Sequence, residues 1–359
     1  MTDKPRHRLL FAREIARDFP VQLSTHHLAA AAESLGNKVL WATRPVALNC
    51  FSRTRLRANL PGQYQPLTPL ARTRRFQHCL KTQLKLARPN AEKWLTLQGV
   101  DDVDVLWIAD PYLGALRAHI PHRRFVMQVT DDYRAFENWG ADMAAALPSL
   151  LREADAVFFS NSDLMHEYEQ AFHLDAVRTL HLSHGIGEVC WPNLAPVSER
   201  KAVYVGSINA WMDWEWLRLL SDRYNLAIDF YGQQPLPQAH PLWFYRGLLP
   251  DAQRTKTLAQ YDLGLLPFRP SPIKKYSEPM KLYDYLAAGL PMLSRLELPE
   301  WAAEFKRGVT TDAARLLSKN ADNYYSMRIE HLTLCQHFAA SNSWKARWQR
   351  AEEFIGLCA

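Results

Sequence analysis

The residues best suited to bind a charged ligand lie between Ser277 and Leu293, where the chain reads Ser-Glu-Pro-Met-Lys-Leu-Tyr-Asp-Tyr-Leu-Ala-Ala-Gly-Leu-Pro-Met-Leu. Pro279 suits the first position of a helix, with Glu278 near the N-cap, because proline has no N–H to leave unpaired and its fixed φ is already helical. The amides of a first helical turn have no acceptor within the helix, and with the helix dipole they favour an anion such as a diphosphate. Lys281 and Asp284 are three residues apart and therefore share one face of this helix. The stretch predicts a helix whose start binds phosphate.

This pattern, Glu-Pro-x-Lys-Leu-x-Asp-Tyr-x-Ala-x-Gly-x-Pro, resembles the donor-site signature of GT-B glycosyltransferases, whose C-terminal domains hold a nucleotide-sugar. In that family the basic residue meets the diphosphate and the acidic residue one turn later meets the ribose hydroxyls. The donor-site positions that the resemblance implies here are Glu278, Pro279, Met280, Lys281 and Asp284. Many retaining members carry two spaced Glu residues, and Tyr276 stands where the first would be, so inversion is favoured. A plain amphipathic helix after a Pro-rich loop is the alternative.

Composition places the chain among soluble proteins with two domains, since it has 359 residues, of which 48% are hydrophobic and 22% charged. No apolar run reaches the ~18 residues that span a bilayer, and the start, Met-Thr-Asp-Lys-Pro-Arg-His-Arg, has no apolar signal segment. We therefore expect a cytoplasmic protein. The five cysteines are scattered without a CxxC pair, which predicts reduced thiols and neither a disulfide framework nor a zinc site.

The N-terminal half alternates short apolar runs with segments that can be helical, which predicts a parallel α/β sheet. The predicted strands are 8–12, 37–42, 104–109, 125–129, 156–160 and 177–182, and residues 23–35 form an Ala-rich helix. The loop at 13–20 lacks the Gly-x-Gly-x-x-Gly turn that binds a dinucleotide, which disfavours the interpretation as a nicotinamide-dependent enzyme. For His26 and His27 we favour histidines on the helix surface, because no spacing typical of metal ligands accompanies them.

The segment 53–93 carries ten Lys or Arg residues against a single acid, Glu92, in a chain whose net charge is +6. Apolar side chains are interleaved with these cations, which is typical of binding to an anionic membrane surface. A solvated basic helix remains an equal alternative. Nucleic acid is not favoured as a partner, because no recognised nucleic-acid-binding motif accompanies the charge.

A candidate catalytic carboxylate follows the predicted strand 125–129, which ends at Thr-Asp-Asp-Tyr-Arg. Ligands of open α/β sheets bind beyond the carboxyl ends of strands, and two adjacent carboxylates point in different directions. Val-Met-Gln-Val-Thr-Asp-Asp resembles the strand and loop that carry the base of the inverting glucuronosyltransferase type of xanthan assembly. The resemblance puts on Asp131 the role of base, which takes the proton of the acceptor hydroxyl. The alternative is that Asp131 and Asp132 only cap the next helix.

The C-terminal half continues the resemblance in an ordered run. After a linker at 192–200 come a strand and tight turn at 202–208, strands at 226–231 and 263–267, a helix at 250–260, and closing helices at 321–338 and 343–354. Gly206 and Ser207 match the first loop of a GT-B donor domain, and in relatives the base packs against the backbone at Arg246, Gly247 and Leu248. His184, in Ser-His-Gly-Ile-Gly, could reach the sugar or phosphate, or it could be structural.

The resemblance implies two Rossmann-like domains facing a cleft. We expect an acceptor domain at 1–188, a nucleotide-sugar domain at 189–342 and a C-terminal helix at 343–359 that packs back on the first domain. The implied reaction moves a sugar from a nucleotide-sugar donor, expected to be UDP-linked, to a hydroxyl of a saccharide or polyprenyl-diphosphate-linked acceptor. The expected setting is exopolysaccharide biosynthesis at the inner face of the cell membrane. No DxD-type metal motif stands on a donor strand, so Lys281 and helix amides are expected to balance the diphosphate without a metal or other cofactor. A sugar-nucleotide epimerase and a non-catalytic nucleotide-sugar-binding assembly subunit are the alternatives.

Overall fold

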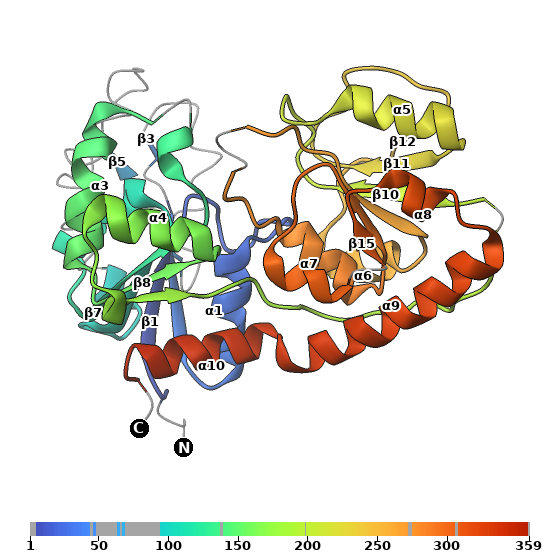
Figure 1. Ribbon diagram of the computed structural model, residues 1–359. Coiled ribbons are helices and arrows are strands. Elements are labelled where there is room, and N and C mark those ends of the chain that lie inside the picture. Colours follow the sequence, from blue (N-terminus) through green and yellow to red (C-terminus); the bar gives the residue numbers. More distant parts are fainter. Residues whose placement is uncertain are drawn as a thin grey trace. The chain divides into compact units, whose positions relative to one another are not determined.

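The computed structural model describes residues 5–43, 94–136, 139–197, 199–271, 275–305 and 308–357, with the backbone alone of residues 46–47, 63–64 and 67–68. The chain forms two compact units (Figure 1). Unit 1 comprises Met1–Ser183 and Arg347–Ala359, and unit 2 comprises His184–Ala346. The bounds expected from the sequence, at 188 and 342, lie a few residues from these.

Unit 1 is built on a parallel sheet of seven strands in the order β4-β2-β1-β6-β7-β8-β9. The strands are β1 (Arg8–Ala12), β2 (Lys38–Ala42), β4 (Gln63–Tyr64), β6 (Val103–Ile108), β7 (His122–Val129), β8 (Ala156–Phe159) and β9 (Thr179–His181). A separate parallel pair joins β3 (Val46–Ala47) to β5 (Leu67–Thr68). The inner strands are apolar along most of their length because helices cover both faces of such a sheet. The predicted parallel α/β architecture is confirmed.

The described helices of unit 1 include α1 (Ser24–Ser34), η2 (Pro111–Ala118), η3 (Tyr133–Ala135), α3 (Ala141–Glu153), α4 (Ser162–Phe172), η4 (Ala176–Arg178) and most of α10 (Trp344–Phe354). The last helix returns to this unit from unit 2. Trp348 of α10 lies with its ring centroid 6.0 Å from those of Phe11 and Trp107, and Phe354 lies 5.7 Å from Phe158. These buried aromatic contacts confirm the prediction that the C-terminal helix packs on the N-terminal domain.

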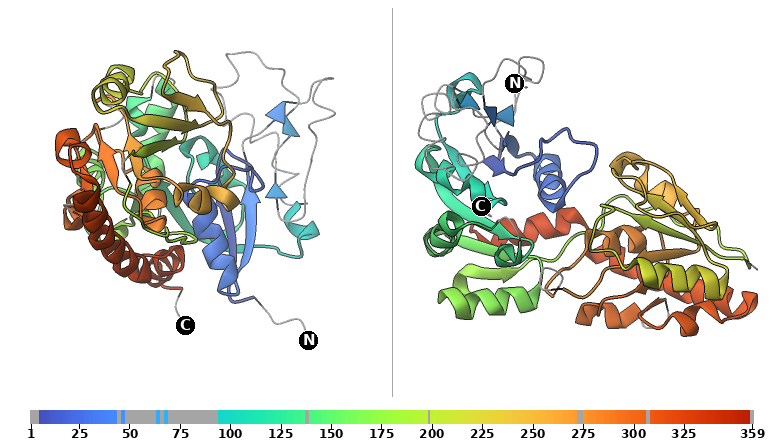
Figure 2. Two further views of the ribbon diagram at one scale, coloured as in Figure 1. Left: turned by 90° about the vertical axis from the view of Figure 1, so that its right-hand side faces the viewer. Right: turned by 90° about the horizontal axis from the view of Figure 1, so that it is seen from above.

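Unit 2 contains a six-stranded parallel sheet in the order β12-β11-β10-β13-β14-β15. Its strands are β10 (Lys201–Val205), β11 (Ala227–Tyr231), β12 (Trp243–Tyr245), β13 (Leu263–Leu266), β14 (Met292–Ser294) and β15 (Val309–Thr310). Its described helices are α5 (Trp214–Tyr224), α6 (Asp251–Leu258), α7 (Met280–Ala287), η6 (Glu300–Phe305), α8 (Ala313–Leu317) and α9 (Ala321–Ser341). Because crossovers between parallel strands are right-handed, α5 lies on one face of the sheet and α6 and α7 lie together on the other, and each unit can be followed in Figure 2.

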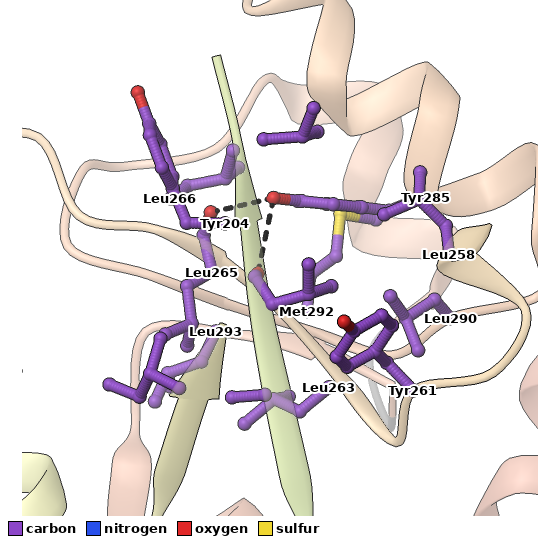
Figure 3. Close-up of a cluster of buried hydrophobic side chains, with 14 of the residues drawn as sticks. Tyr204, Leu258, Tyr261, Leu263, Leu265, Leu266, Tyr285, Leu290, Met292 and Leu293 are labelled. Carbon is purple, nitrogen blue, oxygen red and sulfur yellow. Dashed lines mark hydrogen bonds between the residues drawn. The ribbon is translucent and has the colours of Figure 1, made fainter. Parts of the chain in front are cut away.

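Tyr285 fixes α7 to this sheet. Its buried ring packs among the apolar side chains of the strands, and its hydroxyl donates to the carbonyl oxygens of Leu265 at 3.0 Å and Val203 at 3.4 Å (Figure 3). A Cβ added at Gly264 would lie 2.7 Å from the Tyr285 ring, so the ring reaches the strand because that residue is glycine. The start of α7 is thereby held at a fixed place on the sheet.

His26 corrects the expectation of a surface histidine, since its side chain is buried. The ring accepts a hydrogen bond from the Leu23 amide at Nδ1 and donates from Nε2 to the Ala16 carbonyl. The centroid of the His26 ring also lies 4.5 Å from that of Trp41, with the two ring planes tilted by 40°. Burial lowers the pKa of His26 to about 4, so the ring is neutral at pH 7 and works as a cap for the start of α1.

The remaining expectations from the sequence concern the basic segment, membrane-spanning helices and the cysteines. The basic segment 53–93 lies outside the described residues, apart from the backbone of β4 and β5. In the described part of the chain no helix combines the length and the apolar character that crossing a membrane requires. Two of the cysteines, Cys190 and Cys335, are described, and both are free thiols as predicted.

Candidate functional site

The candidate site of unit 2 lies at the carboxyl edge of its sheet. Parallel strands all end at the same edge, so the loops after β10, β11, β12 and β13 gather there. These loops contribute Gly206 and Ser207, Gly232, the turn 246–248 and the start of α7. The structure therefore brings the candidate residues of these loops and of the start of α7 to one edge of the sheet, and Asp284 follows within α7.

Helix α7 begins one residue later than predicted. Pro279 is its N-cap, with φ −68° and ψ 129°, and Met280 is the first helical residue. The physical reason is that the proline ring fixes φ alone and leaves ψ free to be extended. The Leu282 amide closes the first turn on the Pro279 carbonyl at 3.0 Å, and no side chain caps the helix. The amides of Met280 and Lys281 thus belong to the turn in which a helix supplies no acceptor of its own.

The Lys281 ammonium lies against the backbone of Gly206. A Cβ added at Gly206 would be 2.5 Å from Cε and 2.6 Å from Nζ of Lys281, and the φ of +137° at this glycine is one that L side chains rarely adopt. The ammonium also sits 5.6 Å from the ring centroid of Tyr204 and 5.1 Å from that of Phe268. Aromatic faces and a bare backbone therefore place one positive charge beside the helix amides, an arrangement that suits an anionic ligand.

A second glycine, which sequence reasoning did not single out as a site residue, brings two of these loops together. A Cβ at Gly232, directly after β11, would lie 2.6 Å from the Gly206 carbonyl oxygen. The Gly232 amide donates to the Gly247 carbonyl at 2.9 Å. A glycine at the end of a predicted strand was the available signal, because such positions let backbones approach closely.

Glu278 and His184 are both buried and support the chain that enters α7. The His184 ring donates from Nε2 to the Glu278 carbonyl at 3.0 Å, and it meets the Tyr283 ring edge-on at 5.5 Å. The Glu278 carboxylate accepts a hydrogen bond from the Tyr283 hydroxyl. The geometry thus gives His184 a structural contact at the start of α7, which is one of the two roles expected for it.

Asp284, one turn after Lys281, is paired with a buried arginine of the neighbouring helix. Arg254 of α6 donates through one terminal nitrogen to both carboxylate oxygens of Asp284, at 3.2 and 3.4 Å. Its other terminal nitrogen lies 2.6 Å from Asp251. The side chain of Arg254 is 8% exposed, whereas that of Asp284 is 23% exposed. No sequence pattern indicates this pair, because Arg254 and Asp284 are far apart along the chain.

The turn Arg246-Gly247-Leu248 is held by a buried carboxylate in β11. Arg246 forms two contacts with Asp229, both of 3.1 Å, and the same carboxylate meets Lys201 at 2.9 Å and the Tyr261 hydroxyl at 2.6 Å. Burial raises the pKa of Asp229, but the hydrogen bonds from Arg246, Tyr261 and Lys201 outweigh it and hold that pKa below its ordinary value. The charge of Arg246 is thus engaged with Asp229, and this pair ties the turn to β11.

In unit 1, Asp131 and Asp132 follow β7 and have different partners. Asp132 receives two hydrogen bonds from Arg134, at 2.8 and 3.0 Å, and a third from Tyr168 at 3.1 Å. It also caps η3 through the Arg134 amide. Asp131 accepts from the Thr130 hydroxyl at 3.2 Å and lies directly at the carboxyl end of the strand. Asp132 therefore braces the loop, whereas Asp131 lies two residues beyond the end of β7 and is not part of that brace.

A buried cation stands near Asp131. Arg13, at the end of β1, donates to the Ala109 carbonyl at 2.9 Å and pairs with Glu14 at 2.9 Å, and the Tyr133 hydroxyl reaches the same carbonyl at 3.2 Å. Burial lowers the pKa of Arg13, yet the negative groups around it, Asp131 among them, raise it overall. Sequence reasoning missed Arg13, because one arginine after a predicted strand carries no distinctive spacing.

Among the described residues, no three His, Cys, Asp or Glu side chains are grouped so that they could hold a metal ion. No protein-family model matches the chain. No curated protein matches it either.

Solved structures resemble the whole chain in fold. Sucrose-phosphate synthase from Thermosynechococcus elongatus is 13% identical, with 97% of this chain and 98% of that one covered and a TM-score of 0.69. HepE from Anabaena, in complex with UDP and glucose, is 12% identical over 98% of this chain and 100% of that one, with a TM-score of 0.66. UGT89C1 from Arabidopsis thaliana, complexed with UDP-L-rhamnose, is 11% identical over 99% and 100%, with a TM-score of 0.53. At such identities the likeness shows the fold, which is the predicted GT-B type.

Proposed function

We propose that the protein is a glycosyltransferase that moves a sugar from a UDP-linked donor to a hydroxyl group of a saccharide acceptor. The observation that carries the proposal is the contact of the Lys281 ammonium with Gly206 at the start of α7. A fixed cation, first-turn amides and a bare glycine backbone together suit a diphosphate, the part that UDP-sugars and other nucleoside-diphosphate sugars share.

The donor would lie along the carboxyl edge of unit 2. The base packs on the turn 246–248, the ribose hydroxyls meet Asp284 and the diphosphate meets Lys281, in the roles that the resemblance implies. Two relatives in fold support a UDP-sugar, because HepE was solved with UDP and glucose and UGT89C1 with UDP-L-rhamnose. Glu278 and His184 then keep the chain that enters α7 in place, through the hydrogen bond between them.

The transfer would invert the anomeric centre, with Asp131 as base. The carboxylate of Asp131 takes the proton of the acceptor hydroxyl as its oxygen attacks the anomeric carbon, and the bond to UDP breaks with its electron pair on the phosphate oxygen. Lys281 and the α7 amides stabilise the charge that develops on the diphosphate, and no metal is needed in this scheme. The different partners of Asp131 and Asp132 support this division of roles.

For the acceptor we propose a polyprenyl-diphosphate-linked oligosaccharide at the inner face of the cell membrane, in the synthesis of an exported polysaccharide. The support is the basic segment 53–93, whose cations are nearly unopposed and interleaved with apolar residues. The resemblance of the strand and loop at Asp131 to the xanthan-assembly type points the same way.

A thermal-shift screen of nucleotide-sugars tests the donor, and a transfer assay then tests the reaction. A ligand at 100 times its Kd adds ~2.7 kcal/mol of stability, so UDP-sugars should raise the unfolding temperature clearly and ADP-sugars much less. No shift with any nucleotide-sugar contradicts the donor site. Epimerised or hydrolysed donor without transfer to any saccharide favours an epimerase, and binding without turnover favours an assembly subunit.

A further inference from the structure

The pairing of Arg254 with Asp284 links the two helices that flank the donor site. Arg254 belongs to α6, which starts shortly after the turn 246–248. Asp284 belongs to α7, whose first turn contains Lys281. The two helices lie side by side in Figure 1. The pair therefore stands between the two places where the proposed function puts the base and the diphosphate of the donor. In a nucleotide, the ribose is the group that joins the base to the diphosphate.

We propose that Arg254 is a positioning residue that holds the Asp284 carboxylate for the two ribose hydroxyls of the donor nucleotide. This inference rests on the proposed function. It assigns to Arg254 a role that the donor-site pattern of α7 does not contain.

The burial of the two side chains supports this division of labour. The guanidinium of Arg254 is on the inner side, with 8% of the side chain exposed, and donates to both oxygens of Asp284. The Asp284 side chain keeps 23% of its surface accessible. A carboxylate oxygen has more than one lone pair, so each can accept from the arginine on one side and from a hydroxyl on the other.

The charges of Arg254, Asp284 and Asp251 also favour Asp284 as an acceptor of hydrogen bonds from hydroxyl groups. Arg254 stands between Asp284 and Asp251, so that one cation meets two carboxylates and the three groups together carry one negative charge. Burial lowers the pKa of Arg254, but the two carboxylates raise it overall, and the arginine stays charged. The contact with Arg254 thus gives the Asp284 carboxylate a fixed orientation, which recognition of two neighbouring hydroxyls needs.

The experiment compares the affinities of UDP and 2′,3′-dideoxy-UDP, which lacks both hydroxyls, by calorimetry. Hydrogen bonds to a charged acceptor should make the wild type prefer UDP by about 10- to 100-fold. Asp284→Asn should reduce this preference to about 2- to 10-fold. Arg254→Lys keeps the positive charge but loses the two terminal nitrogens that meet Asp284 and Asp251. It should therefore weaken the binding of UDP and reduce the preference for UDP as Asp284→Asn does. The affinity for the dideoxy nucleotide should change little.

Two further variants separate positioning from loss of fold. Asp251→Asn/Arg254→Gln removes one charge of each sign, keeps the net charge of the cluster and should reduce the preference as Arg254→Lys does. Arg328→Lys alters another buried arginine, which lies in α9 and pairs with Asp262 at 2.6 Å. This variant should leave the preference for UDP over the dideoxy nucleotide unchanged. A preference that stays at the wild-type value in both Arg254 variants overturns the inference while the proposed function stands. A wild type that binds neither nucleotide contradicts the proposed function itself.

Discussion

Removing the charge of Lys281 while keeping its bulk is the most direct test of the donor site. Lys281→Met retains an unbranched stem over Tyr204 and Phe268 but has no ammonium beside Gly206. A charge-assisted hydrogen bond to a phosphate is worth ~1.5–3 kcal/mol, so UDP affinity should fall by roughly 10- to 100-fold. The contacts with two rings are worth ~0.5–1 kcal/mol each, so the loss of folding stability should be small.

Isothermal calorimetry with UDP measures the first effect and urea unfolding the second. Lys256→Met is the matched control, because it removes an exposed lysine of α6 and changes the net charge equally. This control should bind UDP as the wild type does. If Lys281→Met is folded and its affinity for UDP equals that of the control, the diphosphate does not lie at the start of α7 and the argument from Gly206 is wrong.

Three other changes have defined outcomes. Asp131→Asn should lower turnover by ~10²–10⁴-fold at unchanged UDP affinity, measured by transfer kinetics beside UDP titration, and a larger rate loss in Asp132→Asn would move the base by one residue. Tyr285→Phe should lower the free energy of unfolding of unit 2 by ~1 kcal/mol in urea, because a buried hydroxyl with two carbonyl partners is lost, and an unchanged unfolding midpoint would contradict this. Burial lowers the pKa of His331 to about 4, against ~6.5 when unfolded, so stability should be complete above pH 6.5 and decline as the pH falls toward 4; His331→Asn should flatten this decline in pH-dependent thermal unfolding.

The sequence predicted the fold well because the signals of a parallel sheet are local. Each inner strand is a short apolar run, and the helix between two strands separates them clearly, as β1, α1 and β2 illustrate. The same holds for the start of α7, where Lys281 and Asp284 are close enough for spacing alone to place them on one face of the helix. The error of one residue at the N-cap arose because a proline determines only one of its two backbone dihedral angles.

Contacts between distant segments could not be predicted from spacing. His26 reads as a polar residue on a helix, yet two backbone groups outside the helix satisfy its ring and allow it to be buried. The partner of Asp284 is on another helix, and the partner of Arg246 is on another strand. In each case the polar side chain is buried because its partner satisfies it, and the identity of that partner depends on the tertiary fold.

The aspartates Asp132, Asp229 and Asp284 also show how a fold assigns different roles to the same residue type. Asp132 and Asp229 are each satisfied by arginine and tyrosine donors, which is how a buried charge is retained for structural purposes. Asp284 has a single arginine and an accessible remainder, so it combines a fixed orientation with room for a ligand. A carboxylate that serves a ligand must be both oriented and reachable, and the sequence alone distinguishes neither condition. The contacts of the folded chain give Asp284 both conditions, which is why the proposed function assigns the ribose hydroxyls to it.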